Sequence, residues 1–169
     1  MAKNLKWKTR NTDSKHYSNR VIINDKSATY NYRVVETLEA GIVLTGQEVK
    51  SIQDGGANMK GGRIFINANG TEVILAGLHV TPFATYTSDL YHEMDREKKL
   101  LLHKKEIKKM QEWEKVTGQA LVPLRVKLAS NGKVKVDIGL CVGLKKYDKR
   151  EKEKKATAKR DIERALAKK

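Results

Sequence analysis

The fold is decided by the stretch ALVPLRVKLASNGKVKVDIGL, residues 120–140. On each side of Asn131-Gly132, apolar residues alternate with polar or charged ones, which is the two-residue period of a half-buried strand. The dipeptide Asn-Gly favours the tight turn of a β-hairpin. The stretch therefore predicts an antiparallel pair of strands, with one face on a core and a row of Lys and Arg on the other.

Further strand-like runs precede this hairpin. Apolar residues recur from Tyr32 to Leu44, and the runs 64–66 and 73–78 flank a second Asn-Gly at 69–70. Thr81-Pro82 ends the second of these runs, because proline cannot donate to a sheet. About six short strands are therefore expected, joined by at least two tight hairpins.

Helices are predicted at two places. Thr45 and Glu48 fit a capping box, so a short helix should follow, bury Val49 and Ile52, and end at Gly55-Gly56. A second helix is predicted over residues 98–117, ending at Gly118, after a loop over residues 86–96. The fold class is mainly β with about three short helices, and an OB-like antiparallel barrel fits this pattern.

Charge divides the chain into three parts. Of the net charge of +15, residues 1–20 carry +5 and residues 145–169 carry +7, which leaves +3 for the middle. We therefore expect a basic N-terminal arm over 1–29, a barrel over 30–144 and a basic tail over 145–169. Two basic ends on a chain with a pI of about 9.8 indicate a nucleic-acid partner.

The tail has too few apolar residues to form a core of its own. It has a thin apolar stripe at Ala158, Ile162, Ala165 and Leu166 among many lysines. We expect it to be disordered when free and helical along a polyanion, where lysine repulsion is neutralised. The alternative is a tail that only keeps the protein soluble.

The sequence gives little support for a disulfide-bonded, membrane, secreted or catalytic protein. The single cysteine, Cys141, excludes an internal disulfide and fits a buried strand position. No apolar run has the length of a membrane helix, and the N-terminus lacks the apolar block of a secretory signal, so we expect a cytoplasmic protein. The four histidines show no metal-ligand spacing and no catalytic motif is present, so we expect no enzyme activity, metal or cofactor.

Four ordered strings together closely resemble the SmpB (small protein B) family, the bacterial tmRNA-binding proteins. The strings are EAGIVLTGQEVKS (39–51), KKLLLHKKEI (98–107), LVPL (121–124) and YDKRE (147–151). The resemblance implies an OB-like barrel that binds the tRNA-like domain of tmRNA. It implies delivery, with elongation factor Tu, to 70S ribosomes stalled on broken mRNA, where the tail occupies the decoding site on the small-subunit rRNA and the empty mRNA channel.

The resemblance also implies site residues. Those on or near the tmRNA face are Tyr30, Tyr32, Glu39, Lys50, Asn58, Lys99, Leu101, Lys133 and Lys135. Those at the decoding-site junction and tail are Gly143, Lys145, Lys146, Tyr147, Asp148, Lys149 and Arg150. The chain has Tyr30 where the family usually has His, and Val142 and Leu144 where basic residues are frequent.

Residue type alone favours other interpretations at some of these positions. Glu39 would be a solvated strand residue and Leu101 a core residue, whereas Tyr147 fits either a stacking platform for a base or a domain-edge aromatic. For Lys133 and Lys135, phosphate contact and plain solubility are equally favoured by spacing. A generic OB-type binder of structured RNA, or a metal-dependent nuclease with a basic face, are the alternative functions. The nuclease requires a carboxylate cluster that the sequence does not show.

Overall fold

The computed structural model describes residues 20–81 and 95–166. These residues form nine strands and four helices. In chain order they are β1 (Arg20–Asn24), α1 (Lys26–Asn31), β2 (Tyr32–Ile42), α2 (Gly46–Gln53), β3 (Ala57–Asn58), β4 (Arg63–Ile66), β5 (Val73–Ala76), β6 (His79–Val80), β7 (Lys98–Leu101), α3 (Lys104–Glu114), β8 (Gln119–Leu128), β9 (Val134–Gly143) and α4 (Lys146–Leu166). The predicted fold class, mainly β with short helices, is confirmed, with more strands than the sequence indicated.

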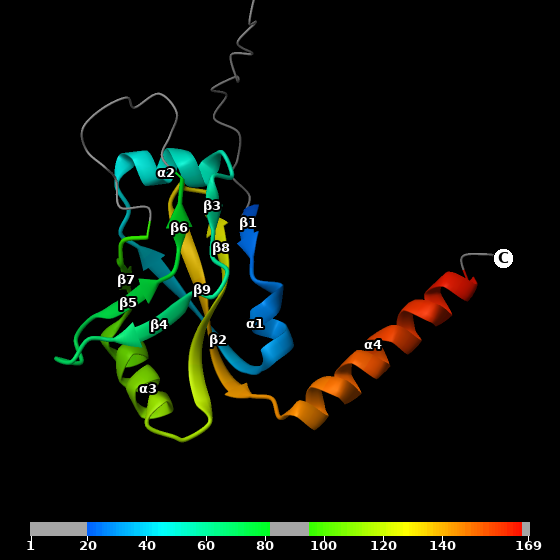
Figure 1. Cartoon of the computed structure of the whole chain (residues 1–169). Helices are drawn as coiled ribbons and strands as arrows, with labels where there is room; N and C mark the ends of the chain where they lie inside the picture. The colour runs from blue at the N-terminus through cyan, green and yellow to red at the C-terminus, as the bar shows by residue number, and fades with distance from the viewer. Residues whose placement is uncertain (1–19, 82–94, 167–169) are drawn as a thin grey trace, which may run out of the picture.

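Seven strands form one antiparallel sheet in the order β1-β8-β9-β2-β7-β5-β4, and β3 pairs with β6 in a separate ribbon. The sheet curls until its edge strand β4 packs against β8, which makes the barrel in Figure 1. Three register shifts help it to bend, between β1 and β8, between β2 and β9, and between β8 and β9. Such bulges add curvature and twist to the strands that carry them. The expected OB-like barrel agrees with this arrangement.

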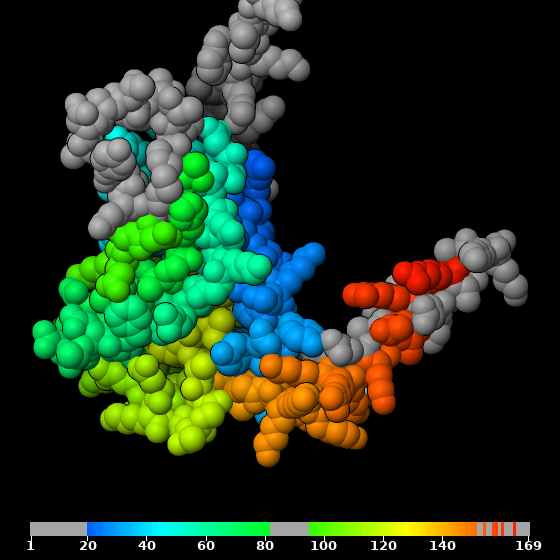
Figure 2. Space-filling view, viewed as in Figure 1, coloured from blue at the N-terminus to red at the C-terminus, as the bar shows by residue number. Residues whose placement is uncertain are grey.

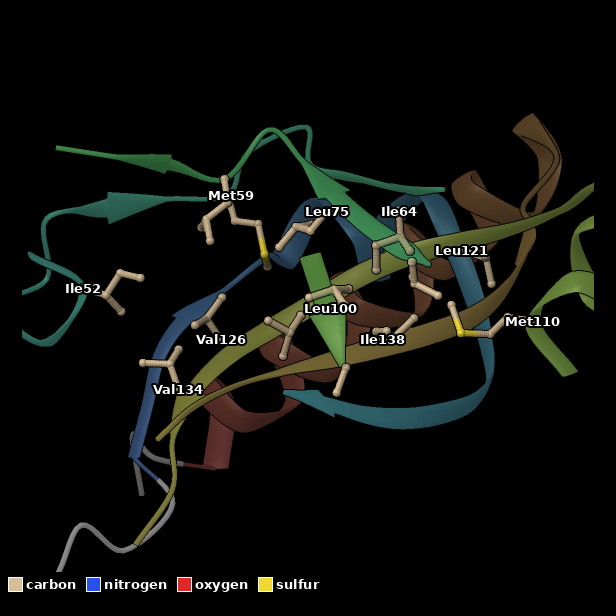
Figure 3. Packing of buried hydrophobic residues seen from close by; sticks show 14 of the residues in the cluster. Ile52, Met59, Ile64, Leu75, Leu100, Met110, Leu121, Val126, Val134 and Ile138 are labelled. Carbon is tan, nitrogen blue, oxygen red and sulfur yellow. The ribbon is translucent and has the colours of Figure 1, made fainter. Parts of the chain in front are cut away.

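The core fills the barrel between α2, α3 and the inner face of the sheet (Figure 3). Val126, Val136 and Ala40 are direct neighbours across β8, β9 and β2, and none of them is exposed. This shared register sets the inward face of the three longest strands. Because side chains alternate along a strand, it also sets which residues face outward.

Local sequence signals are confirmed at both hairpins and at α2. Gly70 and Gly132 have φ angles of 67° and 76°, the left-handed backbone that an Asn-Gly turn requires. At α2, the Glu48 amide donates to Thr45 Oγ1 at 3.4 Å, and the Thr45 amide donates to Glu48 Oε2 at 2.7 Å. The helix buries Ile52 as predicted.

The helix predicted over 98–117 is wrong in its first part. Lys98–Leu101 is strand β7, which pairs with β2 on one side and with β5 on the other. Lys98 and Leu100 point inward and are buried, whereas Lys99 and Leu101 are exposed. Pairing on both sides outweighs the helix propensity of a Lys-Lys-Leu-Leu run, and α3 begins only at Lys104.

The barrel begins earlier than the boundary predicted at residue 30. Strand β1 pairs with β8 from Arg20 to Asn24, so only residues before it can belong to an arm. Helix α1 follows, capped by Asp25, whose Oδ1 accepts from the Ser27 amide at 2.8 Å. Both elements depend on pairing and packing with distant residues, which local patterns do not report. Residues 1–19 of the arm predicted over 1–29, and most of the loop predicted over 86–96, lie outside the described residues.

The single cysteine lies in β9 and is fully buried. It packs with Ala28, Val122 and Leu124 in a small second cluster beneath α1. Burial raises the pKa of the Cys141 thiol to about 11. The thiol therefore stays protonated at neutral pH, and the prediction of a buried strand cysteine is confirmed.

Three charged side chains meet inside the barrel where β7 approaches α2. Glu48 Oε1 accepts from Arg96 Nε at 2.9 Å, and Lys98 Nζ lies 3.7 Å from the same oxygen. Lys98 Nζ also donates to the carbonyls of Leu78 and Arg96, each at 2.8 Å. Burial raises the pKa of the Glu48 carboxyl, but hydrogen bonds from Arg96 and Thr45 and the charges of Arg96 and Lys98 outweigh it. The result is a pKa below the ordinary value.

We predict that Glu48→Ala lowers the free energy of unfolding by about 3–5 kcal/mol, because it leaves Lys98 buried without its carboxylate. The exposed Glu97→Ala is the matched control, and its effect should stay within about 0.5 kcal/mol. Urea unfolding at neutral pH measures both. The contribution of Glu48 is complete above the ordinary pKa of 4.5 and is lost as pH falls through the lower pKa of the folded state. The difference between wild type and Glu48→Ala should therefore shrink in acid, and equal losses in the two variants would contradict the role of Glu48.

Candidate nucleic-acid interface

The outward face of β2, β9 and β8 carries a compact group of charges, which we call the charged face: Glu39, Arg125, Lys127, Lys135 and Asp137. Glu39 is directly opposite Asp137, and Asp137 is opposite Arg125. Lys127 is opposite Lys135 in the next outward row. Three neighbouring strands thus hold three cations and two carboxylates at fixed positions relative to one another.

Ion pairs join these side chains into a chain across the strands. The Glu39 carboxylate accepts from both Lys127 Nζ and Lys135 Nζ. Lys127 Nζ also lies 2.8 Å from Asp137 Oδ1, and Arg125 Nε lies 3.9 Å from Asp137 Oδ2. The prediction of a cation row opposite the core is confirmed, but the row is interleaved with acids.

The pKa directions agree with this geometry. Hydrogen bonds from Lys127 and then Lys135 hold the pKa of the Glu39 carboxyl below its ordinary value. Hydrogen bonds to Asp137 and Glu39 raise the pKa of Lys127 above its ordinary value. Glu39 and Lys127 are therefore charged at neutral pH. The Lys127 and Lys135 ammonium groups both contact the Glu39 carboxylate.

An exposed apolar side chain adjoins the charged face. Gly41 in β2 lies between Leu101 in β7 and Lys135 in β9 in the paired register. A Cβ added at Gly41 would lie 3.4 Å from Leu101 Cβ, an ordinary contact distance, so the Leu101 side chain lies directly beside Gly41. Leu101 is 54% exposed. The core position favoured by residue type is therefore wrong for Leu101, which belongs to neither core cluster of the described residues.

Other residues expected on the RNA face lie around this centre or away from it. Lys99 is exposed on β7 and pairs with Glu72, and Lys133 is exposed at the end of the β8–β9 hairpin. Lys50 on α2 and Asn58 on β3 are exposed on elements outside the β2–β9–β8 face, and Asn58 Oδ1 accepts from the Lys60 amide at 3.0 Å.

The two expected tyrosines lie at the other end of β2. Tyr32 pairs with Gly143, roughly 23 Å along the strand from Glu39 at about 3.3 Å per residue. Tyr30 is 42% exposed on α1. The structure thus brings Glu39, Leu101 and Lys135 together, and places the tyrosines beside the root of the tail instead.

The tail root is fastened to α1. The Leu144 amide donates to the Asn31 carbonyl at 3.1 Å, and Lys149 Nζ donates to Asn31 Oδ1 at 3.0 Å. Asp148 Oδ2 accepts from the Lys145 amide at 3.2 Å, which closes the first turn of α4. Beyond this turn α4 stands away from the barrel (Figure 2).

The remaining predicted junction residues lie along the same short segment. Gly143 ends β9, and Lys146, Tyr147 and Arg150 lie in the first turns of α4. Tyr147 is 75% exposed, so its ring is available to a partner. The helical form expected on a polyanion is the form that the structure gives, and disorder of the free tail stays a prediction.

Sequence reasoning missed Arg125, Lys127 and Asp137 as members of the site. Their alternation with apolar residues indicated the outward face but not which distant acid each cation would meet. The pairing of β2 with β9 supplies that information, since it brings Glu39 within reach of Lys127 and Lys135.

The described part of the chain lacks two features, a metal-binding cluster and a membrane-spanning helix. Residues 20–81 and 95–166 hold no group of three or more His, Cys, Asp or Glu side chains placed to share a metal ion. Within the same ranges, no helix combines the length and apolar character needed to cross a membrane.

Comparison with known proteins identifies the family. The family model described as SmpB protein matches residues 22–168. The chain belongs to the SmpB family. The four strings that resembled this family lie on β2 and α2, on β7 and α3, on β8, and on the first turn of α4, so they include Glu39 and Leu101 at the centre of the site.

Curated relatives cover nearly all of this SmpB chain. The SsrA-binding protein of Syntrophobacter fumaroxidans is 42% identical over 156 residues, covering 92% of this chain and 94% of the relative. The SsrA-binding protein of Oceanobacillus iheyensis is 45% identical over 147 residues, covering 87% and 93%. A chain in the solved structure "tmRNA-SmpB: a journey to the center of the bacterial ribosome" matches with a TM-score of 0.60 and 32% identity, covering 76% of this chain and 92% of that chain.

Proposed function

We propose that this SmpB protein binds the tRNA-like domain of tmRNA and delivers it to ribosomes stalled on broken mRNA. The observation that carries the proposal is identity of 42–45% over most of the chain to proteins named SsrA-binding proteins. The solved relative that shares the fold belongs to a tmRNA–SmpB structure of the ribosome. We assign the chain an RNA-binding role in the bacterial cytoplasm, with no catalytic step of its own.

The charged face and Leu101 form the centre of the proposed tmRNA surface. Lys127 and Lys135 are held in place by Glu39, so they can meet phosphates with little loss of side-chain freedom. The Glu39 carboxylate can accept from a ribose hydroxyl or a base amine, groups that folded RNA exposes. Leu101 offers an apolar contact to a ribose or base. Lys50, Asn58, Lys99 and Lys133 extend the surface around this centre, and Tyr30 and Tyr32 add two aromatic rings near the other end of β2.

A carboxylate among lysines gives selectivity that lysines alone lack. Phosphate contacts attract any RNA, whereas groups that need a hydrogen-bond donor at one position reject RNA of another shape. Glu39 lies between two ammonium groups, so a misplaced phosphate would meet it at close range. The charged face is therefore suited to recognise one RNA architecture.

The tail is assigned to the small ribosomal subunit. The first part of this segment would contact rRNA at the decoding site. Its residues are Gly143, Lys145, Lys146, Tyr147, Asp148, Lys149 and Arg150. The rest of α4 would lie in the empty mRNA channel, where its lysines meet phosphates. The root held by Asn31 fixes the direction in which α4 leaves the barrel. Elongation factor Tu joins the delivery complex in this proposal.

We predict that Glu39→Arg weakens tmRNA binding about tenfold or more, the scale of one lost charge-assisted hydrogen bond. The substitution also places a third cation beside Lys127 and Lys135, so the ion pairs that orient these two lysines are lost. The side chain is exposed, and the barrel should stay folded. A filter-binding titration gives the affinity, circular dichroism gives the fold, and Glu112→Arg on α3 is the control for added charge. Unchanged affinity would remove Glu39 from the site.

We predict that deleting residues 151–169 leaves tmRNA affinity near normal and abolishes peptide tagging on stalled ribosomes. Ala158→Pro keeps every charge of the tail but breaks a helix interior at a cost of about 3 kcal/mol. If the helical form is needed, this variant also loses tagging while keeping tmRNA affinity. Both readouts come from a reconstituted tagging reaction and a parallel tmRNA titration. Tagging by the truncated protein would show that the tail model is wrong.

A further inference from the structure

A groove of about 490 Å³ opens on the barrel where α1, the start of β4, the end of α3 and the start of β8 meet. In Figure 1, α1 faces the segment that leads into β4. Strand β8 pairs with β1 only from Arg125 onward, so its first residues have no strand partner on this side. The groove is therefore a gap at the seam of the barrel, away from the charged face.

Three side chains of the polar lining supply hydrogen-bond acceptors, beside Ser27 and Asn31, which can also donate. Gln119 Oε1 is buried and has no hydrogen-bond partner among the described residues. Glu114 and Asp25 add two carboxylates, and Asp25 uses Oδ1 to cap α1. Arg63 is the cation of the lining, and it forms no ion pair with any described residue. A buried acceptor without a partner carries a free-energy cost, so a ligand that donates to it is favoured.

The rest of the lining favours a flat group. Tyr32 supplies an aromatic side chain, and Ala28, Ala120 and Val122 supply small apolar ones. Gly61 and Gly62 form part of the lining without side chains. The volume falls within the range of pockets that hold small molecules or nucleotides.

We infer that this groove binds an unpaired guanine nucleotide. The Watson–Crick edge of guanine presents an N1–H and an N2 amine side by side, which suits a carboxylate and the oxygen of Gln119. Adenine, cytosine and uracil each present fewer donors on that edge. The base stacks against Tyr32, and Arg63 receives the phosphate. The groove shares Tyr32 with the tmRNA surface proposed above, and its other lining residues lie outside that surface.

An arginine side chain from a basic peptide is the competing occupant, since it is also flat and rich in donors. Arg63 attracts the phosphate of a nucleotide, but Glu114 and Asp25 in the same lining attract a guanidinium, so charge does not separate the two occupants. The volume exceeds what one arginine side chain fills. The volume therefore favours the nucleotide.

The test is a titration of the full-length ¹⁵N-labelled protein with each of the four nucleoside 5′-monophosphates and with N-acetyl-arginine amide. We expect GMP to bind with a Kd of about 1 mM and to perturb the amides of Gly61, Gly62 and Ala120. The other nucleotides and the arginine probe should bind at least about fivefold more weakly. Equal binding of all four nucleotides, tighter binding of the arginine probe, or no perturbation at the groove would overturn the inference.

Variants separate the groove from general RNA binding. Glu114→Gln and Gln119→Leu should each weaken GMP binding about fivefold, whereas Glu112→Gln, exposed on the same helix, should leave it unchanged. Equal losses in Glu114→Gln and Glu112→Gln would overturn the inference. A wild-type protein that binds GMP but not tmRNA would refute the proposed function and leave the groove intact.

The guanine that fills the groove can belong to a free nucleotide or to an RNA. A single-stranded oligoadenosine that contains one guanosine distinguishes them in the same assay. Tighter binding of this RNA than of GMP assigns the groove to an unpaired base in RNA, and tighter binding of GMP assigns it to free nucleotide. An oligoadenosine without guanosine that binds the groove equally well would overturn the guanine assignment.

Discussion

The register of β2 on β9 is the constraint on which the rest of the molecule depends. It places Ala40 opposite Val136 in the core, and so it places Glu39 opposite Asp137 on the surface. A slip of one residue would turn Glu39 inward and expose Ala40. The bulge between Val34 and Glu36 takes up the extra residue near the tail, so the register at Glu39 and the register at Tyr32 are both satisfied. One strand thereby serves the charged face at one end and the tail root at the other.

The same register provides a physical basis for the selectivity proposed for this protein, which has a net charge of +15. Its charge is separated into two kinds of surface. The charged face holds lysines against carboxylates at fixed positions, which suits recognition of one arrangement of phosphates and hydroxyls. The tail carries a dense positive charge on an isolated helix, which suits attraction to any phosphate-lined channel. Asn31 joins the two parts, because it accepts a hydrogen bond from Lys149 at the root of α4.

The sequence was sufficient to predict the elements that a local signal marks. Asn-Gly at 69–70 and 131–132 gave both hairpins, and Thr45 with Glu48 gave the start of α2. It was insufficient where an element exists through distant pairing. Strand β1 lacks any local marker beyond a short apolar run, and Lys98–Leu101 has the composition of a helix but is held between β2 and β5. The buried Lys98 could not be predicted, because its partners Glu48 and Leu78 come from other elements.

The candidate site divides in the same way. Alternation along 120–140 predicted that Lys135 faces outward, and the resemblance to SmpB pointed to Glu39 and Leu101. The role of Lys127 and Asp137 in orienting these groups required the three-strand register. The central claim, that the charged face recognises the shape of one RNA, is tested most directly by titrating the protein with tmRNA and with an unrelated folded RNA of similar size across a range of salt. We expect the protein to bind tmRNA about tenfold or more tightly than the unrelated RNA, and we expect this preference to persist at raised salt. Equal affinities that fall together with salt would contradict it and would indicate a generic binder of structured RNA.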